Sequence, residues 1–285
     1  MFQGRIMDRL AAEQARLSAM TRGAWNDYEP HRRIVTEHLI AKRPPGRDRL
    51  CVLGAGNAND LDLPRLTATF REVHLVDLDA EALALGVSRQ GMLGTPTVYC
   101  HEGVDVTGIL PRLAAWDPRL PPSDEELTQC VRAAREYGGP NLPGPFDVVA
   151  STCLLSQLID SVVTSLADSH PRFPELLLAV RDRHLRLLVE LLVPGGLAVL
   201  ITDLVSSDTC AELATVADAE LSELVARLVA ERNFFSGTNP QLIKTWFKQD
   251  RSTGGSLAGV YLSRPWRWQV GPRTYAVYAI RAQRA

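Results

Sequence analysis

The chain alternates between short, nearly continuous apolar runs and longer stretches in which apolar residues return at helical spacing. Short apolar runs bounded by glycine, proline or acidic residues are typical of strands buried on both faces of a parallel sheet. Five such runs occur, at 50–53, 72–76, 97–100, 146–150 and 197–202. Because helical patterns separate them, the sequence predicts a doubly wound α/β sheet.

The last part of the chain follows a different pattern, in which two alternating apolar–polar segments flank a tight turn. The segments are 265–270 and 274–280, and Gly271 and Pro272 lie between them. Such a pair predicts an antiparallel hairpin. Together with the preceding strands it gives a mostly parallel, seven-stranded, Rossmann-like sheet with an antiparallel hairpin at its C-terminal end.

Helices are expected between the strands and ahead of the first one. Asp79 is a good N-cap for a helix over 80–86, and Ser123 with Glu126 forms a capping box. Two helical stretches precede the first strand, and the proline-rich segment 42–47 ends the second of them. We therefore divide the chain into an N-terminal helical cap, 1–47, and a main domain, 48–285.

The turn after the first predicted strand contains Gly54, Ala55 and Gly56. Glycine lacks a Cβ, so the backbone can turn tightly and a ligand can lie against its N–H groups. Asp77 ends the second strand 21 residues after Gly56. A nucleotide-binding βαβ unit presents a carboxylate to a ribose at a spacing of about 20 residues. The sequence therefore predicts a nucleoside site at the carboxyl ends of the strands, with Asp77 on the ribose and Asp79 as the helix cap.

A third motif, Pro194-Gly195-Gly196, precedes the fifth strand. The glycine loop, Asp77 and this motif, in that order, resemble the class I S-adenosylmethionine-dependent methyltransferases over roughly residues 47–282. Asn59 stands where a dinucleotide fingerprint has a third small residue. Val52 stands where the resembled family usually has an acid, two residues before the first glycine.

The resemblance implies S-adenosylmethionine as the cofactor, with contacts from the glycine loop and from the residues after strands two, three and four. An aromatic residue in the polar break between the two cap helices is expected to close over the cofactor as well. The residues so assigned are Gly54, Ala55, Gly56, Asp77, Leu78, Asp105, Val106, Ser151 and Tyr28. Asp105 is equally suited to a plain turn, and Tyr28 to the core of a structural cap. Thr152 could make the contact after strand four in place of Ser151.

The segment after strand four also bears on the methyl acceptor. It lacks the Asn-Pro-Pro-aromatic tetrad that is typical of enzymes methylating nucleic-acid bases, and no stripe of basic and aromatic residues appears elsewhere. We expect methyl transfer to an O or N atom of a small molecule or short peptide, without a nucleic-acid partner. The resemblance supplies no catalytic base. His31 and His170, in segments expected above the carboxyl ends of the strands, are weak candidates and are equally suited to ordinary structural or surface positions.

The composition of the chain bears on the cellular compartment that we expect for the protein. A hydrophobic fraction of 46% and a net charge of −2 over 285 residues are ordinary for a soluble protein. No apolar run approaches the roughly 18 residues of a membrane span, and the N-terminus lacks an apolar signal core. The five cysteines are scattered, and no His/Cys/carboxylate set has metal-ligand spacing. We expect a cytoplasmic protein without a membrane partner or a bound metal.

Three other activities stay open on these observations. An NAD-dependent oxidoreductase on a similar sheet requires a third glycine, against which Asn59 argues. An aminopropyltransferase requires an acid-rich pocket, which the sequence does not reveal. A protein that binds S-adenosylmethionine without turnover is consistent with Val52.

Overall fold

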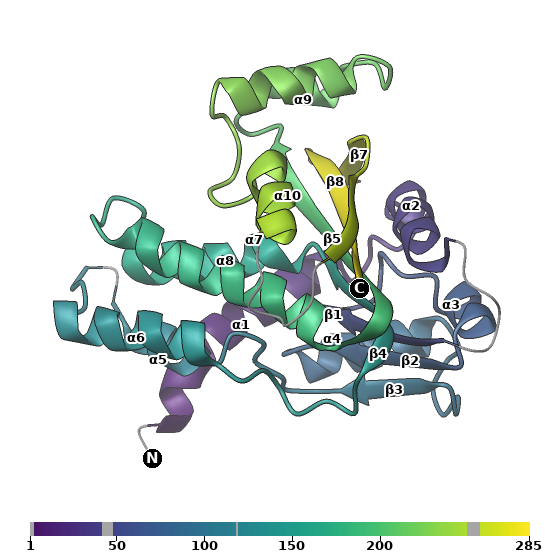
Figure 1. The fold of residues 1–285 in the computed structure, drawn as a ribbon, viewed down its shortest axis with the longest axis horizontal. Coiled ribbons are helices and arrows are strands. Elements are labelled where there is room, and N and C mark those ends of the chain that lie inside the picture. The colour runs from purple at the N-terminus through teal and green to yellow at the C-terminus, as the bar shows by residue number, and fades with distance from the viewer. Residues whose placement is uncertain (1–2, 42–47, 118, 250–256) are drawn as a thin grey trace.

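A mixed sheet runs through the centre of the molecule (Figure 1). The computed structural model describes residues 3–41, 48–117, 119–249 and 257–285, and within these ranges eight strands form one sheet. The strands are β1 (Arg49–Leu53), β2 (Glu72–Val76), β3 (Val98–His101), β4 (Phe146–Thr152), β5 (Leu192–Ser206), β6 (Leu257–Leu262), β7 (Trp266–Val270) and β8 (Arg273–Arg284).

Helices connect most of these strands and cover both faces of the sheet. They are α1 (Gln3–Thr21), α2 (Glu29–Ile40), α3 (Leu63–Thr69), α4 (Ala80–Arg89), α5 (Leu110–Ala115), α6 (Asp124–Glu136), α7 (Leu154–Leu166), α8 (Phe173–Glu190), α9 (Leu221–Ala230) and α10 (Pro240–Gln249), with a 3-10 turn at η1 (Ala211–Ala214). The predicted caps are both present: Asp79 accepts from the Ala82 N–H, and Ser123 and Glu126 form the capping box.

The strand order is β3-β2-β1-β4-β5-β8-β6, and β7 also pairs with β8. Strands β1 to β5 are parallel, and β8 is antiparallel to β5, β6 and β7. The order reverses between β1 and β4, which is the switch point at which doubly wound sheets bind ligands. The predicted fold class and its C-terminal hairpin are confirmed. The sheet has eight strands because β6 and β7 share one edge of β8, at the position where the pattern predicted a single strand.

Two apolar cores lie on opposite faces of the sheet, because successive side chains of a strand point to opposite faces. In β1, Cys51 and Leu53 pack into the core formed with α5, α6, α7 and α8. Leu50 and Val52 pack into the core formed with α2, α3 and α4. Both layers are visible in Figure 1. Burial on both faces explains why the strands are nearly continuous in apolar residues.

The connection after β4 contains a helix, α7, that the sequence pattern did not single out. Its N-cap residue, Cys153, is left-handed (φ 49°) and makes no side-chain capping bond. The usual Ser, Thr, Asp or Asn cap that marks a helix start is therefore missing from the sequence. The sharp turn at Cys153 aims the first residues of α7 at the carboxyl ends of the strands.

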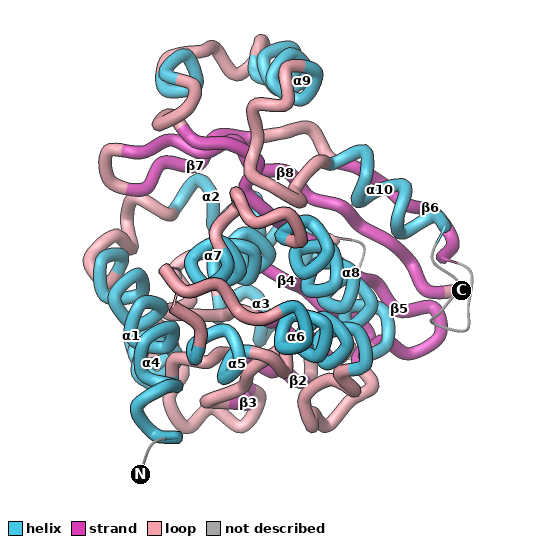
Figure 2. Tube along the Cα trace, turned by 90° about the vertical axis from the view of Figure 1, so that its left-hand side faces the viewer, coloured by secondary structure: helices cyan, strands magenta, loops and turns pink. Residues whose placement is uncertain are grey.

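The N-terminal helices take separate places in the fold. Helix α1 packs against α5 and α4 (Figure 2), while α2 packs against α3 and the sheet. The predicted linker 42–47, and with it the boundary between cap and main domain, falls outside the described residues. None of the described helices combines the length and apolar character that a membrane span requires.

Candidate functional site

A pocket of about 910 Å³ lies at the carboxyl ends of β1, β2, β4 and β5. Its walls come from the loops after these strands, the C-terminal part of α1, the start of α7 and the turn between β7 and β8. Ligand pockets for small molecules typically measure about 300–1,000 Å³. The pocket therefore lies where the sequence predicted a ligand site, and it is large enough for a nucleoside cofactor together with a small second ligand.

The two glycines of the loop after β1 have different structural roles. Gly54 has φ +75°, and a Cβ added there would lie 2.7 Å from the Cβ of Leu154, so this glycine lets the loop pack against α7. Gly56 has φ +49°, and an added Cβ would meet no atom within 4 Å, although the residue lines the pocket. Gly56 thus leaves free space on the pocket side of the loop, where a ligand can approach the backbone.

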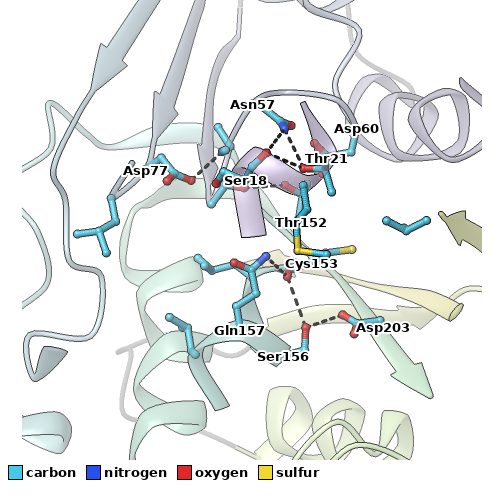
Figure 3. Close-up of a pocket in the computed structure, with 18 of the residues that line it drawn as sticks. Ser18, Thr21, Asn57, Asp60, Asp77, Thr152, Cys153, Ser156, Gln157 and Asp203 are labelled. Carbon is cyan, nitrogen blue, oxygen red and sulfur yellow. Dashed lines mark hydrogen bonds between the residues drawn. The ribbon is translucent and has the colours of Figure 1, made fainter. Parts of the chain in front are cut away.

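Asp77 closes this loop from the end of β2. Its Oδ2 accepts a hydrogen bond from the Gly56 N–H at 2.7 Å (Figure 3), and its Oδ1 accepts from the Asp79 N–H at 2.8 Å. Burial raises the pKa of Asp77, and these backbone donors oppose the shift. A carboxylate has about four lone-pair positions, so Asp77 keeps acceptor capacity toward the pocket that it lines.

Asp105 serves the turn after β3 and lines the pocket as well. It accepts from the backbone N–H and the hydroxyl of Thr107 and from the Leu110 N–H, at 2.6–3.0 Å. Its carboxylate therefore organises the turn that leads into α5. Leu78 and Val106 line the pocket beside Asp77 and Asp105.

Ser151 lies outside the pocket. It is fully buried, and its hydroxyl is 2.8 Å from Nε2 of His184 on α8. The next residue, Thr152, lines the pocket in its place, because successive side chains of β4 point to opposite faces of the sheet. The sequence left Ser151 and Thr152 both open as pocket residues, and the structure places Thr152 at the pocket and Ser151 in the core.

Neither candidate base lines the pocket. His31 is only 1% exposed, its Nδ1 accepts from the indole N–H of Trp266, and its ring stacks on Trp268 at 4.4 Å. Burial lowers the pKa of His31 to about 3, so its imidazole is neutral. The Nδ1 atom of His170 accepts from the Arg172 N–H in the turn before α8. Both histidines have structural partners, and no histidine is among the described residues that line the pocket.

Tyr28 lines the pocket, and the end of α1 joins it there. The Tyr28 ring packs edge-on against Trp268 at 5.2 Å, and burial raises the pKa of its hydroxyl, which hydrogen-bonds Thr21. The Asn57 amide donates to the Thr21 hydroxyl at 2.9 Å and to the Ser18 carbonyl at 3.3 Å. The glycine loop and the end of α1 are therefore tied together across the pocket wall (Figure 3).

Two buried acids at the pocket were not singled out from the sequence. Asp60 is 9% exposed, hydrogen-bonds the Thr152 hydroxyl, and has its pKa raised to about 7 by burial. Asp203, near the end of β5, is 7% exposed and accepts from the Ser156 hydroxyl at 2.5 Å. Burial raises the pKa of Asp203 as well. Asp203 directly follows the fifth apolar run, the same position relative to its strand that marked Asp77.

The pocket walls are acidic overall. Five aspartates and two arginines line it, and the described lining contains no lysine, glutamate or histidine. Among the residues placed by the structure, no group of three or more His, Cys, Asp or Glu side chains is arranged to hold a metal ion.

No protein-family model and no curated protein sequence matches the chain. Solved structures resemble it at a coarse level. The N-methyltransferase NodS from Bradyrhizobium japonicum, in complex with S-adenosyl-L-homocysteine, has a TM-score of 0.46 at 10% identity over 90% of this chain and 86% of its own. The magnesium protoporphyrin IX methyltransferase of Synechocystis, with bound S-adenosylhomocysteine, has a TM-score of 0.43 at 13% identity over 90% and 83%. An rRNA methylase from Streptococcus thermophilus has a TM-score of 0.38 at 10% identity over 87% and 93%.

Proposed function

We propose that the protein is an S-adenosylmethionine-dependent methyltransferase that modifies an O or N atom of a small molecule or short peptide. The observation that carries the proposal is the pairing of Gly56 with Asp77 at the switch point of the sheet. Gly56 leaves open space on the pocket side of its backbone, and the Asp77 carboxylate lies 2.7 Å from its N–H. A ribose and the chain attached to it fit such a cradle.

The remaining walls suit the other parts of this cofactor. In this proposal Asp105, Leu78 and Val106 lie toward the adenine, and Tyr28 and Thr152 toward the methionyl end. Val52 is fully buried in the core and cannot contact a ligand. Asp60, which lines the pocket and bonds Thr152, is the acid that we assign to the methionyl ammonium instead. When bound, S-adenosylmethionine supplies a methyl group that its positive sulfur activates for transfer.

The protein itself then contributes by positioning the acceptor against the methyl donor and by excluding water from the pocket. Alignment of acceptor and donor in a closed pocket can supply much of the rate acceleration. Segment 1–47 acts as a cap in this proposal, because the end of α1 and Tyr28 form one wall of the pocket. The acidic walls favour small acceptors over nucleic acid, whose phosphates would be repelled.

The loop geometry argues against a dinucleotide. In a dinucleotide site the helix begins directly beneath the pyrophosphate. Here α3 begins at Leu63, seven residues after Gly56, with Asp62 as its N-cap. Asn59, at the third small position, is buried and donates to the Thr21 carbonyl.

Calorimetric titration tests the proposal. S-adenosylhomocysteine, S-adenosylmethionine, NAD and decarboxylated S-adenosylmethionine are titrated separately into the full chain. We expect S-adenosylhomocysteine to bind in the micromolar range and NAD not to bind. Tighter binding of NAD than of S-adenosylhomocysteine would indicate an oxidoreductase. Tighter binding of the decarboxylated cofactor than of S-adenosylmethionine would indicate an aminopropyltransferase. Binding of S-adenosylhomocysteine without turnover of any metabolite would indicate a binding protein.

A further inference from the structure

Asp203 lies at the opposite end of the pocket from Asp77. Three inter-strand spacings separate β2 from β5 in the order β2-β1-β4-β5, which amounts to about 14 Å. Figure 3 shows the two carboxylates on opposite sides of Thr152 and Cys153. If Asp77 holds the ribose, Asp203 faces the part of the pocket left for a second ligand.

No ion pair neutralises the Asp203 carboxylate among the residues that the structure describes. The Ser156 hydroxyl donates to Oδ1, and within the described chain no lysine, arginine or histidine forms an ion pair with Asp203. Arg273, which also lines the pocket, pairs with Asp208 at 2.8 Å. A buried carboxylate is costly unless it is paired. Its placement on a ligand pocket therefore favours a ligand that brings a positive charge.

Aromatic rings line the same pocket, and burial and the nearby negative charge of Asp203 raise the pKa of the Tyr275 hydroxyl. Trp268 and Tyr275 both line the pocket, with ring centroids 5.5 Å apart, and Tyr28 packs on Trp268. Aromatic faces attract organic cations and also pack against apolar groups. This wall fits an ammonium group attached to an apolar or aromatic body.

We propose that the methyl acceptor is an amine, which binds as an ammonium ion on Asp203 against the rings of Trp268 and Tyr275. The inference rests on the proposed methyltransferase function and specifies its acceptor. The ammonium nitrogen gives one proton to Oδ2 of Asp203, because Oδ1 already accepts from Ser156. The freed lone pair forms the new N–C bond to the methyl carbon, while the electrons of the broken C–S bond stay on sulfur and the proton passes from Asp203 to water.

Burial supports this role for Asp203. It raises the pKa of the carboxyl toward that of an ammonium group, so proton transfer from the acceptor becomes less unfavourable.

The test uses full-length protein saturated with S-adenosylhomocysteine. Phenethylamine, 2-phenylethanol and phenylacetate, which share one aromatic body, are titrated by calorimetry. We expect the amine to bind at least tenfold more tightly than the alcohol or the carboxylate. In Asp203→Asn the amine should lose at least tenfold in affinity, while the affinity for S-adenosylhomocysteine stays within twofold. Asp168→Asn, which changes an exposed aspartate outside the pocket lining, is the matched control and should leave both affinities unchanged.

The outcomes separate this inference from the proposed function. If S-adenosylhomocysteine does not bind the wild type, the methyltransferase proposal is overturned, and the acceptor assignment with it. If it binds but the amine does not, or if the alcohol binds as tightly as the amine, only the amine assignment is overturned. An amine affinity within twofold of wild type in Asp203→Asn overturns the role of Asp203. Even if Asp203→Asn fails to fold, the affinities of the wild type for the three probes show whether the pocket prefers a positively charged ligand.

Discussion

At the scale of single residues, two aspartates separated by one residue show how the position of a side chain determines its structural role. Asp77 lines the pocket and holds the glycine loop, whereas Asp79 caps α4 by accepting from the Ala82 N–H. Both are carboxylates after the same strand, so chemical type alone does not distinguish them. Substitution of Asp77 therefore tests the proposed cofactor site, and substitution of Asp79 is its control.

Asp77→Ala should weaken binding of S-adenosylhomocysteine by roughly 1.5–3 kcal/mol, the usual contribution of hydrogen bonds to a charged group. Asp79→Ala should leave binding unchanged and lower the free energy of unfolding by about 1 kcal/mol through loss of the helix cap. Calorimetry and thermal melts of the two variants measure both effects. Equal affinity of a folded Asp77→Ala protein and the wild type would remove Asp77 from the site.

The two glycines give a second matched pair. Gly56→Val places methyl groups in the open space of the pocket, so ligand binding should be lost while the melting temperature falls only by the cost of a left-handed β-branched residue. Gly54→Val collides with Leu154, so the melting temperature should fall much further. Tight binding by Gly56→Val would show that the ligand lies elsewhere.

The sequence predicted residues whose role follows from backbone position and missed those whose role follows from packing. Asp77 was found because its spacing from Gly56 is a property of the βαβ unit. Ser151 and Thr152 were both candidates because the sequence does not show which face of β4 meets the pocket. His31 was a weak candidate for a base near the substrate, but its partners Trp266 and Trp268 lie more than 230 positions later in the chain and enclose it.

At the scale of elements, helix α1 forms a wall of the pocket and is attached to the loop after β1 by polar contacts. Its C-terminal end lines the pocket, and the amides of Asn57 and Asn59 donate to Ser18 and Thr21. The helix packs on α5 and α4 and forms no part of the sheet. The sheet should therefore form without it.

Deletion of residues 1–22 should leave a folded protein that binds S-adenosylhomocysteine about tenfold more weakly, equivalent to about 1.4 kcal/mol. Amide exchange should accelerate at the start of α7, which loses cover. Calorimetry and hydrogen exchange measure these changes. Arg22→Ala, which removes an exposed ion pair with Glu81, is the control and should change neither. Undiminished affinity after the deletion would make α1 a structural element only.

Strands were more predictable than helices in this fold. The parallel strands are buried on both faces, so their apolar runs stand out in the sequence. Helix α7 lacks a capping residue, and its start depends on the left-handed turn at Cys153, a conformation that composition does not reveal. The edge of β8 shared by β6 and β7 depends on register along a long strand, which only the folded chain defines.

At the scale of the whole molecule, the buried acids couple stability to pH. The pKa of Asp60 is raised from 3.8 to about 7, so the folded state binds this proton more tightly than the unfolded state does. Asp203 shifts in the same direction. Between about pH 4 and pH 7, Asp60 therefore lowers the free energy of unfolding as pH rises, and Asp203 acts in the same direction. The buried histidines, whose pKa values are lowered, act in the opposite sense.

A comparison of wild type with Asp60→Asn isolates the aspartate from those histidines. The variant should gain stability relative to wild type as pH rises from 5 to 8, measured by thermal melts at matched ionic strength. If Asp60 faces the methionyl ammonium, S-adenosylhomocysteine should bind the wild type more tightly at pH 8 than at pH 6, and the variant should lose this dependence. A constant stability difference across this range would show that Asp60 is already ionised in the fold.

The hairpin of β7 and β8 has a consequence for how this protein can diversify. Its turn and flanking residues supply Trp268, Gly271, Pro272 and Tyr275 to the pocket within one short contiguous segment, while the glycine loop and Asp77 lie near the other end of the chain. Beyond the turn, β8 is anchored by β5 along most of its length. If the proposed function holds, insertions or exchanges in this one segment alter the choice of acceptor and leave the glycine loop and Asp77 intact.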